Sequence, residues 1–167
     1  MPIVIPTVTF DPTKTIIPRK TYVTLTPSVA GVPQTPVSII GKLCDYEQTI
    51  ETTQREVPDA DGFLRPDRTV PKKRTQGFKF EVEDVKTLAG AFAGSTGIEG
   101  GFSTGTAEVF IVDPDDAVTA IALHSNIFKA SWQLDGGFKL TAGEVTKATI
   151  KIDALEKVVL TPNALLA

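Results

Sequence analysis

Short stretches in which apolar and polar residues alternate recur along the chain and predict β-strands. The most regular is Val145–Leu155, in which Ala148, Ile150, Ile152 and Ala154 alternate with polar side chains. Such alternation predicts a strand with one buried and one solvated face. Similar patterns predict further strands at Thr21–Thr26, Ala107–Val112, Val118–His124, Ile127–Leu134 and Val158–Leu160.

The segment Ser38–Asp84 departs from this regular pattern. Its two ends, Ser38–Thr53 and Thr75–Val82, have the apolar content of strands, and Gly41 indicates a β-bulge or a close backbone approach. Beyond Cys44 the first strand is polar on both faces, so it cannot lie in a core. We therefore expect it to project from the body and to pair with its return strand or with another chain.

Between these two strands lies the insert Gln54–Arg74, which we predict to be a long protruding loop. Three prolines and an aspartate–glycine turn dipeptide favour a loop over regular structure. Six basic and four acidic residues give the insert a charge of about +2, which leaves the rest of the chain near -5 of the total -3. Phe63 and Leu64, at its middle, fit either a docking surface or a small cluster that folds the loop back on itself.

The segment after the second strand has the period of a helix. Apolar residues recur at helical spacing through Val85–Ala93. Asp84 is the expected N-cap and Gly94 the expected residue after the C-cap. Gly90 lowers the stability of this helix by roughly 1 kcal/mol relative to alanine, so packing against the body must hold it.

Two segments complete the predicted architecture. Met1–Pro18 is apolar but interrupted by prolines, which predicts an extended N-terminal arm, and the glycine-rich Ser95–Thr106 predicts a mobile loop. The 167 residues suit a single domain, 1–167, with a substantial core. The predicted fold is mainly β: a β-sandwich or barrel with one flanking α-helix, a long protruding hairpin loop (54–74) and an extended N-terminal arm (1–18).

Composition narrows the class of protein. The net charge of -3 argues against a general nucleic-acid binder, which usually has a basic face. A single cysteine excludes an intrachain disulfide, and the N-terminus lacks the basic region of a signal peptide. No apolar run approaches the roughly 20 residues that span a bilayer. We therefore expect a soluble protein without membrane association, made in the cytoplasm.

The sequence offers few candidates for chemistry. His124 has no partner at recognisable spacing, so a structural role at a strand end is the better interpretation, and Cys44 is expected to be a packed thiol. The aspartates of 113–116 fit a turn better than a calcium loop, and Gly94–Gly105 lacks the lysine of a phosphate-binding loop. Trp132 is expected to anchor a core or an interface. We therefore predict no catalytic residue, no metal, no cofactor and no enzymatic activity.

The order of the elements resembles the major tail tube protein of tailed bacteriophages. The matching pieces are the arm Met1–Pro18, the insert Gln54–Arg74, the helix Val85–Ala93 and the late strands. The ending GEVTKATIKIDALEKVVLTP is also similar to the last strands of such proteins. The tube protein of type VI secretion systems shares this fold, although its N-terminus differs from this one. The resemblance covers nearly the whole chain and depends on layout, with no diagnostic motif.

The resemblance implies a structural virion protein that forms rings, usually of six subunits, stacked into the hollow tail tube through which DNA passes. It implies assembly in the host cytoplasm, contacts with further copies, and contacts with tail sheath, terminator, baseplate and tape measure proteins. The insert would reach the adjacent ring through Arg55, Phe63, Leu64, Arg65, Arg68, Lys72, Lys73 and Arg74. Candidates for the lining of the lumen are Glu47, Glu51, Lys147, Thr149, Lys151 and Asp153.

Lys147 and Lys151 share a predicted face with Asp153, so a uniformly negative lumen does not follow from the sequence.

Two other functions fit the same residues. A β-sandwich binding module, such as a head decoration or adhesin-like domain, would have the same strand pattern and no tendency to self-assemble. A small enzyme fits less well, because no catalytic constellation is visible.

Overall fold

The computed structural model describes residues 20–92, 101–112, 121–136 and 142–162, apart from the side chains of 43, 44, 121 and 122. The predicted arm Met1–Pro18 and the aspartate turn at 113–116 lie outside these ranges, as do the thiol of Cys44 and the whole of Gly94.

The described chain consists of nine strands and one short helix. In order they are β1 (Lys20–Val29), β2 (Val32–Pro33), β3 (Val37–Pro58), β4 (Leu64–Val82), α1 (Val85–Gly90), β5 (Phe102–Val112), β6 (Ile121–Ser125), β7 (Phe128–Leu134), β8 (Ala148–Ala154) and β9 (Leu160–Pro162). The prediction of a mainly β fold with one flanking helix is confirmed.

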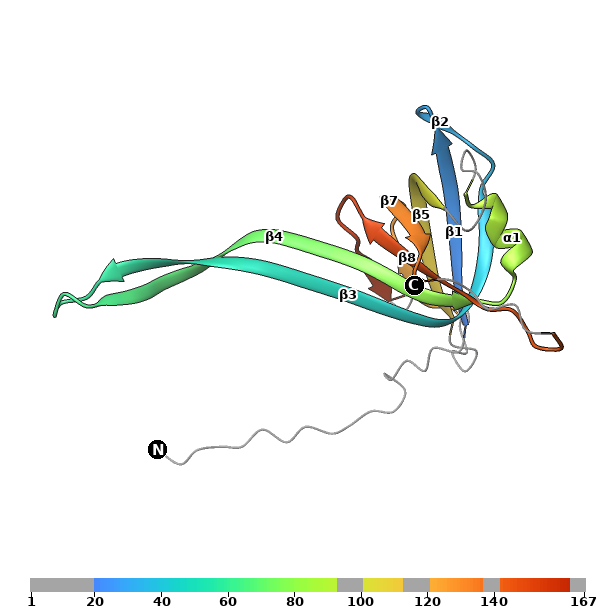
Figure 1. Cartoon of the computed structure of the whole chain (residues 1–167). Coiled ribbons are helices and arrows are strands. Elements are labelled where there is room, and N and C mark those ends of the chain that lie inside the picture. The colour runs from blue at the N-terminus through green and yellow to red at the C-terminus, as the bar shows by residue number, and fades with distance from the viewer. Residues whose placement is uncertain (1–19, 93–100, 113–120, 137–141, 163–167) are drawn as a thin grey trace.

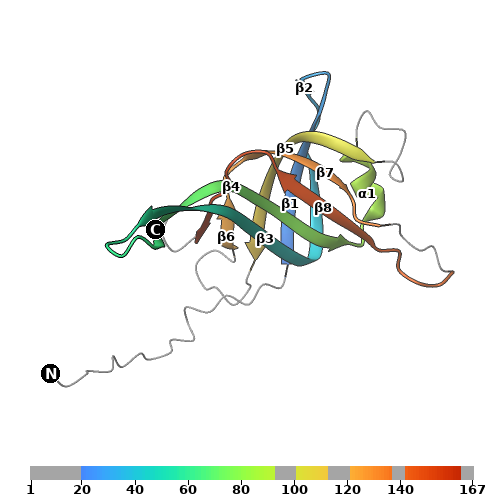
Figure 2. The ribbon, with the colours of Figure 1, turned by 60° about the vertical axis from the view of Figure 1, so that its left-hand side comes forward.

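The strands form one antiparallel sheet in the order β2-β1-β3-β4-β8-β7-β5-β6-β9. A further pairing joins β1 to β5 along the whole of Lys20–Pro27, so six strands make a closed circuit: β1, β3, β4, β8, β7 and β5. Figure 2 shows these strands wrapping around a common interior. The architecture is therefore one continuous sheet that closes on itself, with β2, β6 and β9 as extensions.

The interior of this closed sheet holds the core. Alternate residues of the six strands in the circuit point inward where these strands enclose the interior, as the burial of Val23 and Leu25 on β1 and of Ile150 and Ile152 on β8 shows. The alternation predicted for Val145–Leu155 is thus confirmed over Ala148–Ala154, while the residues at both ends of the predicted segment lie outside the strand. The largest fully buried side chains are Trp132, Phe78, Phe80 and Phe128, which come from β4 and β7.

Helix α1 lies beside the first part of β3 (Figure 1). Its N-cap is Asp84, as predicted, and the carboxylate accepts a hydrogen bond from the Thr87 amide at 3.1 Å. The helix ends at Gly90, three residues before the predicted end at Ala93. The shortening agrees with the weak helix propensity of glycine, and the buried indole of Trp132 donates to the Ala91 carbonyl at 2.8 Å.

The main correction concerns Gln54–Arg74, which is not a loop. β3 has 22 residues and β4 has 19, and their pairing runs out to Pro58 opposite Leu64. Prolines suggested a loop because they cannot donate to a ladder. On the outer part of a two-stranded hairpin each strand has a free edge, so a missing donor there is tolerated. Only residues 59–63 connect the strands.

A second correction concerns the glycine-rich Ser95–Thr106, whose end is strand rather than loop. β5 begins at Phe102 and includes Gly105. A Cβ atom at Gly105 would lie 2.0 Å from the Thr26 carbonyl oxygen and 3.0 Å from the Trp132 ring. Glycine is required here by the close approach of β1 and the core, so it does not signal mobility.

The prediction for Gly41 is confirmed in both of its forms. The β3–β4 register shifts between Gly41 and Cys44, which marks a bulge. A Cβ atom at Gly41 would also lie 2.6 Å from Cδ2 of Phe80. The bulge lies where β3 leaves its partner β1 and continues with β4 alone.

Candidate assembly surface

The outer half of the β3–β4 hairpin extends away from the body as a two-stranded ribbon (Figure 1). β1 pairs with β3 only as far as Gly41, and β8 pairs with β4 only from Gly77 to Val82. Every residue of β4 from Leu64 to Thr75 is exposed. Among the described residues, nothing pairs with either outer edge of this ribbon, so a row of backbone donors and acceptors faces solvent on both sides.

The end of the ribbon is an ordered turn built around Asp59. Its carboxylate accepts hydrogen bonds from the amides of Asp61 and Phe63, both at 3.0 Å, and also forms an ion pair with Arg65. Gly62 takes the positive φ of 81° that this turn needs. The backbone amide of Asp59 donates to the Phe63 carbonyl at 2.8 Å, which closes the connection.

This turn presents Phe63 and Leu64 to solvent, with exposed fractions of 71% and 65%. The interpretation in which these two side chains fold the segment back on itself is therefore wrong for the single chain. Two adjacent apolar side chains at the end of a ribbon have no core of their own to enter. They remain available to a partner.

At the base of the ribbon, Gln76 joins the hairpin to the C-terminal part of the chain. Its side chain is 7% exposed, and its amide group donates to the Val158 carbonyl at 3.0 Å while its oxygen accepts from the Val158 amide at 3.0 Å. The same amide group donates to the Tyr46 hydroxyl at 2.6 Å and to Gln48 at 3.2 Å. The Gln76 side chain thus makes the two backbone hydrogen bonds of Val158 that a neighbouring strand would otherwise make. It does so at the boundary between the closed sheet and the ribbon.

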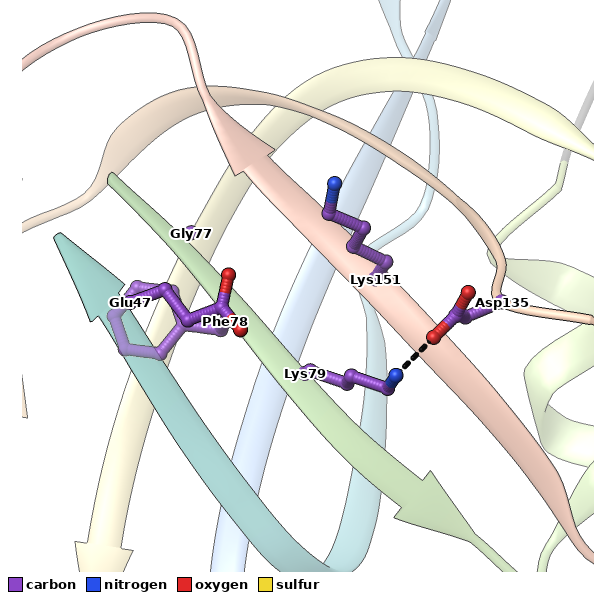
Figure 3. Close-up of a pocket in the computed structure, with 6 residues that line it drawn as sticks. All are labelled: Glu47, Gly77, Phe78, Lys79, Asp135 and Lys151. Atoms are coloured by element: carbon purple, nitrogen blue, oxygen red, sulfur yellow. Dashed lines mark ion pairs between the residues drawn. The ribbon is translucent and has the colours of Figure 1, made fainter. Parts of the chain in front are cut away.

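The outward face of β4 and β8 carries paired charges. Lys147 lies 3.0 Å from Glu81, Lys151 lies 3.4 Å from Asp153, and Lys79 is paired with Asp135. Figure 3 shows the last pair, with Lys151 beside it, in a shallow depression that Glu47 also lines. Opposite charges on one face lower its net field, so this face is mixed rather than uniformly acidic.

Hydrogen bonding to a charged partner shifts the pKa of Lys79, Asp135 and Lys147. The Asp135 carboxylate raises the pKa of Lys79, and Lys79 in turn lowers the pKa of Asp135. Glu81 raises the pKa of Lys147 in the same manner. Lys79, Asp135 and Lys147 therefore keep their charges throughout the neutral range.

The structure brings together the residues that the sequence analysis proposed for the lumen. Gly77 of β4 lies between Glu47 of β3 and Asp153 of β8, and Lys79 of β4 lies opposite Lys151 of β8. Glu47, Lys151 and Asp153 therefore point outward on adjoining strands. Thr149 lies on the same face, and Glu51 continues it along the ribbon, opposite Lys73. The residues proposed for inter-ring contact all lie on the exposed outer ribbon: Arg55, Phe63, Leu64, Arg65, Arg68, Lys72, Lys73 and Arg74.

The sequence analysis missed Asp59, Gln76 and Tyr46. The alternation within the predicted strand Thr75–Val82 could have identified Gln76, because Gln76 lies two residues before Phe78 and therefore on the inward face. A glutamine placed on the buried face of a strand needs hydrogen-bond partners.

The other residues considered for catalysis or binding lie in surroundings that suit a structural role. His124 Nε2 lies 2.7 Å from Glu108 Oε1, and its ring stacks on Phe110 at 4.5 Å. Trp132 is buried in the core. In the described part of the chain no group of three or more acidic, histidine or cysteine side chains could hold a metal ion. No helix within the described ranges has the length and apolar character needed to cross a membrane.

Comparison with known proteins gives structural neighbours only. No family model matches the chain, and no curated protein matches it. A chain of the anti-feeding prophage cap, the AFP tube terminating cap, has a TM-score of 0.47 and 11% identity, covering 95% of this chain and 96% of that one. A chain of the PVC sheath-tube complex, from an extracellular contractile injection system, has a TM-score of 0.42 and 9% identity, covering 84% and 88%.

A chain from the tail of an empty GTA particle has a TM-score of 0.41 and 12% identity, with coverage of 92% of this chain and 99% of that one. The structural neighbours are thus components of tails and contractile injection systems, in agreement with the resemblance noted in the sequence.

Proposed function

We propose that this protein is a structural subunit that self-assembles into rings, stacked into the hollow tube of a phage-type tail. The observation that carries the proposal is the exposed β3–β4 ribbon, whose two outer edges pair with no other described strand and whose end is an apolar turn. A long flat edge of this kind recruits other chains by backbone hydrogen bonding.

The ribbon should be only marginally stable in a monomer. An isolated two-stranded hairpin is marginally stable at best, because burial of apolar surface does not support it. Pairing of its edges with strands of a neighbouring copy would complete the ladder and continue the sheet from one subunit to the next. A repeated head-to-tail contact of this type closes into a ring or propagates as a filament.

The two sets of candidate residues have separate roles in this proposal. The outward face that includes Glu47, Thr149, Lys151 and Asp153 would line the lumen, and its paired charges would limit adhesion of DNA in transit. The turn with Phe63 and Leu64, and the basic residues behind it, would contact the adjacent ring.

The proposal includes further partners and a location. A tube subunit would contact tail sheath, terminator, baseplate and tape measure proteins, and it would have no enzymatic activity. It would assemble in the host cytoplasm and remain in the virion as part of the tail. The six-fold ring is the expectation that follows from the sequence resemblance.

The decisive experiment removes the ribbon and keeps the body. Ile50 and Arg74 lie directly opposite each other, so residues 51–73 can be replaced by an Asn-Gly turn that closes the hairpin at that pair. Negative-stain electron microscopy of the intact protein should show rings or tubes of uniform width. The shortened protein should remain folded, with a cooperative thermal transition, and should form no tubes.

Two outcomes would contradict the proposal. An intact protein that stays monomeric at high concentration and at every salt concentration tested would favour a binding module instead. Normal tubes from the shortened protein would show that the ribbon is not the assembly element.

A further inference from the structure

The ribbon has two charged poles on one of its faces, and they define how a second copy must be placed along it. Opposite residues in an antiparallel pair share a face, and successive residues of a strand alternate. Asp45, Glu47, Glu51 and Arg55 of β3 therefore lie on the same face. The register irregularity after Glu51 adds its extra residue to β4, so the alternation of β3 continues through it.

The outer pole is basic. Arg55 lies directly opposite Arg68 in the β3–β4 ladder. Two like charges in this arrangement repel each other and destabilise the pair. Among the described residues no carboxylate lies within ion-pair distance of either guanidinium, whereas nearby Arg65 is neutralised by Asp59. This face of the ribbon thus carries two positive charges at this point, and the sequence neighbours Glu56 and Asp67 are acidic.

The inner pole is acidic. Asp45 lies opposite Lys79, and Glu47 lies opposite Gly77. Lys79 forms its ion pair with Asp135, and no other cation of the described chain forms an ion pair with Asp45 or Glu47. The lysine and Asp135 cancel, which leaves a charge of -2 from the two acidic side chains of β3.

The two poles are too far apart to neutralise each other within one molecule. Glu47 and Arg55 are eight residues apart on an extended strand, which corresponds to about 26 Å at about 3.3 Å per residue. The Debye length at physiological ionic strength is about 8 Å, so the attraction between the poles is largely screened. A second copy displaced along the ribbon by this distance would bring the poles of the two molecules together.

We propose that the Arg55–Arg68 pole of one copy docks against the Asp45–Glu47 pole of a second copy. The inference rests on the proposed self-assembly and specifies its register. It moves Glu47 from the lumen lining into the contact between copies and leaves Thr149, Lys151 and Asp153 to line the lumen. The partner is identified by charge complementarity: a ribbon with the same two poles offers an acidic pair for each basic pair. Repeated between parallel copies this contact is head-to-tail and can continue from copy to copy, whereas two antiparallel copies would satisfy both poles at once and stop at a dimer.

The experiment is a charge-swap cycle on the full-length protein. One variant carries Arg55→Glu and Arg68→Glu, a second carries Asp45→Lys and Glu47→Lys, and a third combines all four substitutions. The critical concentration for assembly is measured by ultracentrifugation at low salt. Each reversed pair should raise it on the order of tenfold or more, because exposed attractive pairs become repulsive.

The combined variant should restore assembly, because its poles are again complementary and its net charge is unchanged. Lys86→Glu with Lys129→Glu is the matched control: it makes the same charge change as the arginine reversals, on exposed residues outside the ribbon. The control should assemble like the wild type, and higher salt should narrow the difference between wild type and reversed variants.

The results separate this inference from the proposed function. If the wild type assembles and the reversed variants assemble equally well, or if the combined variant fails to recover, the register is wrong while self-assembly stands. If the wild type never assembles, the proposed function fails first. Thermal melts of all variants establish that each one is folded.

Discussion

One strand, β4, lies in two different environments. From Gln76 to Val82 every second residue is buried against the core, whereas from Leu64 to Thr75 every residue is exposed. Backbone pairing with β3 is continuous through both halves, apart from local register shifts. Within the described residues the inner half is thus held by burial of apolar area and the outer half by cross-strand pairing.

The difference shows where the stability of the molecule originates and where its binding capacity lies. Burial stabilises the closed sheet whether or not a partner is present. The outer ribbon has open edges and exposed apolar side chains, so its contribution to the free energy should depend on a second copy. Substitutions in the two halves should therefore affect different measurements.

The largest expected effect comes from truncating a core aromatic residue. Phe80→Ala removes a side chain that is 1% exposed, and it should lower the free energy of unfolding by about 3–5 kcal/mol. Phe63→Ala makes the same chemical change at the end of the ribbon and should alter that free energy by less than about 0.5 kcal/mol. Urea denaturation of the unassembled protein measures both values.

This matched pair tests the comparison directly. Phe63→Ala should instead reduce tube formation, because an exposed apolar residue at the turn contributes only when a partner covers it. A large loss of stability from Phe63→Ala would show that the ribbon is packed against something within its own chain.

Gln76 should give the next largest effect, since it lies at the boundary between the two environments. Gln76→Leu leaves the buried amide and carbonyl of Val158 without partners, which should cost about 1–3 kcal/mol. Hydrogen exchange of the Val158 amide should accelerate in step with this loss. Gln133→Leu, at an exposed position on β7, is the control and should change neither quantity.

An unchanged exchange rate at Val158 in a folded Gln76→Leu protein would contradict the assigned hydrogen bonds. An acceleration confined to residues near Val158 and the ribbon base would place Gln76 as the link between the hairpin and the C-terminal segment. An equal acceleration throughout the core would assign it a general role in stability.

The body could be predicted from the sequence because burial imposes a period of two. Within Val145–Leu155 the alternating residues Ala148, Ile150 and Ile152 are buried, whereas Val145 and Leu155 at the two ends are exposed. The ribbon could not be predicted in this manner. A strand that is exposed on both faces has no apolar alternation, and its prolines at 66 and 71 resemble those of a loop.

Contacts between particular residues also could not be predicted from the pattern of apolar and polar positions. Gly105 was assigned to a mobile loop, although its missing side chain is what allows β1 and Trp132 to approach. The proposed assembly residues were nevertheless placed on a projecting element, because their polarity excluded them from a core. Their roles in the lumen and between rings stay predictions.

The smallest expected effect concerns the exposed Lys79–Asp135 pair on the outward face of the body. Asp135 has a lowered pKa, so its contribution to stability is present above its ordinary range near pH 4 and is lost as the pH falls through the lowered value. Lys79 has a raised pKa, so its contribution is lost only as the pH rises through that raised value. The pair should therefore stabilise the body between these limits.

Asp135→Asn should slightly lower the urea midpoint at pH 7 and have no such effect at a pH below the pKa of Asp135. A double-mutant cycle with Lys79→Met isolates the interaction, and a coupling that persists at low pH would exclude the ion pair as its source.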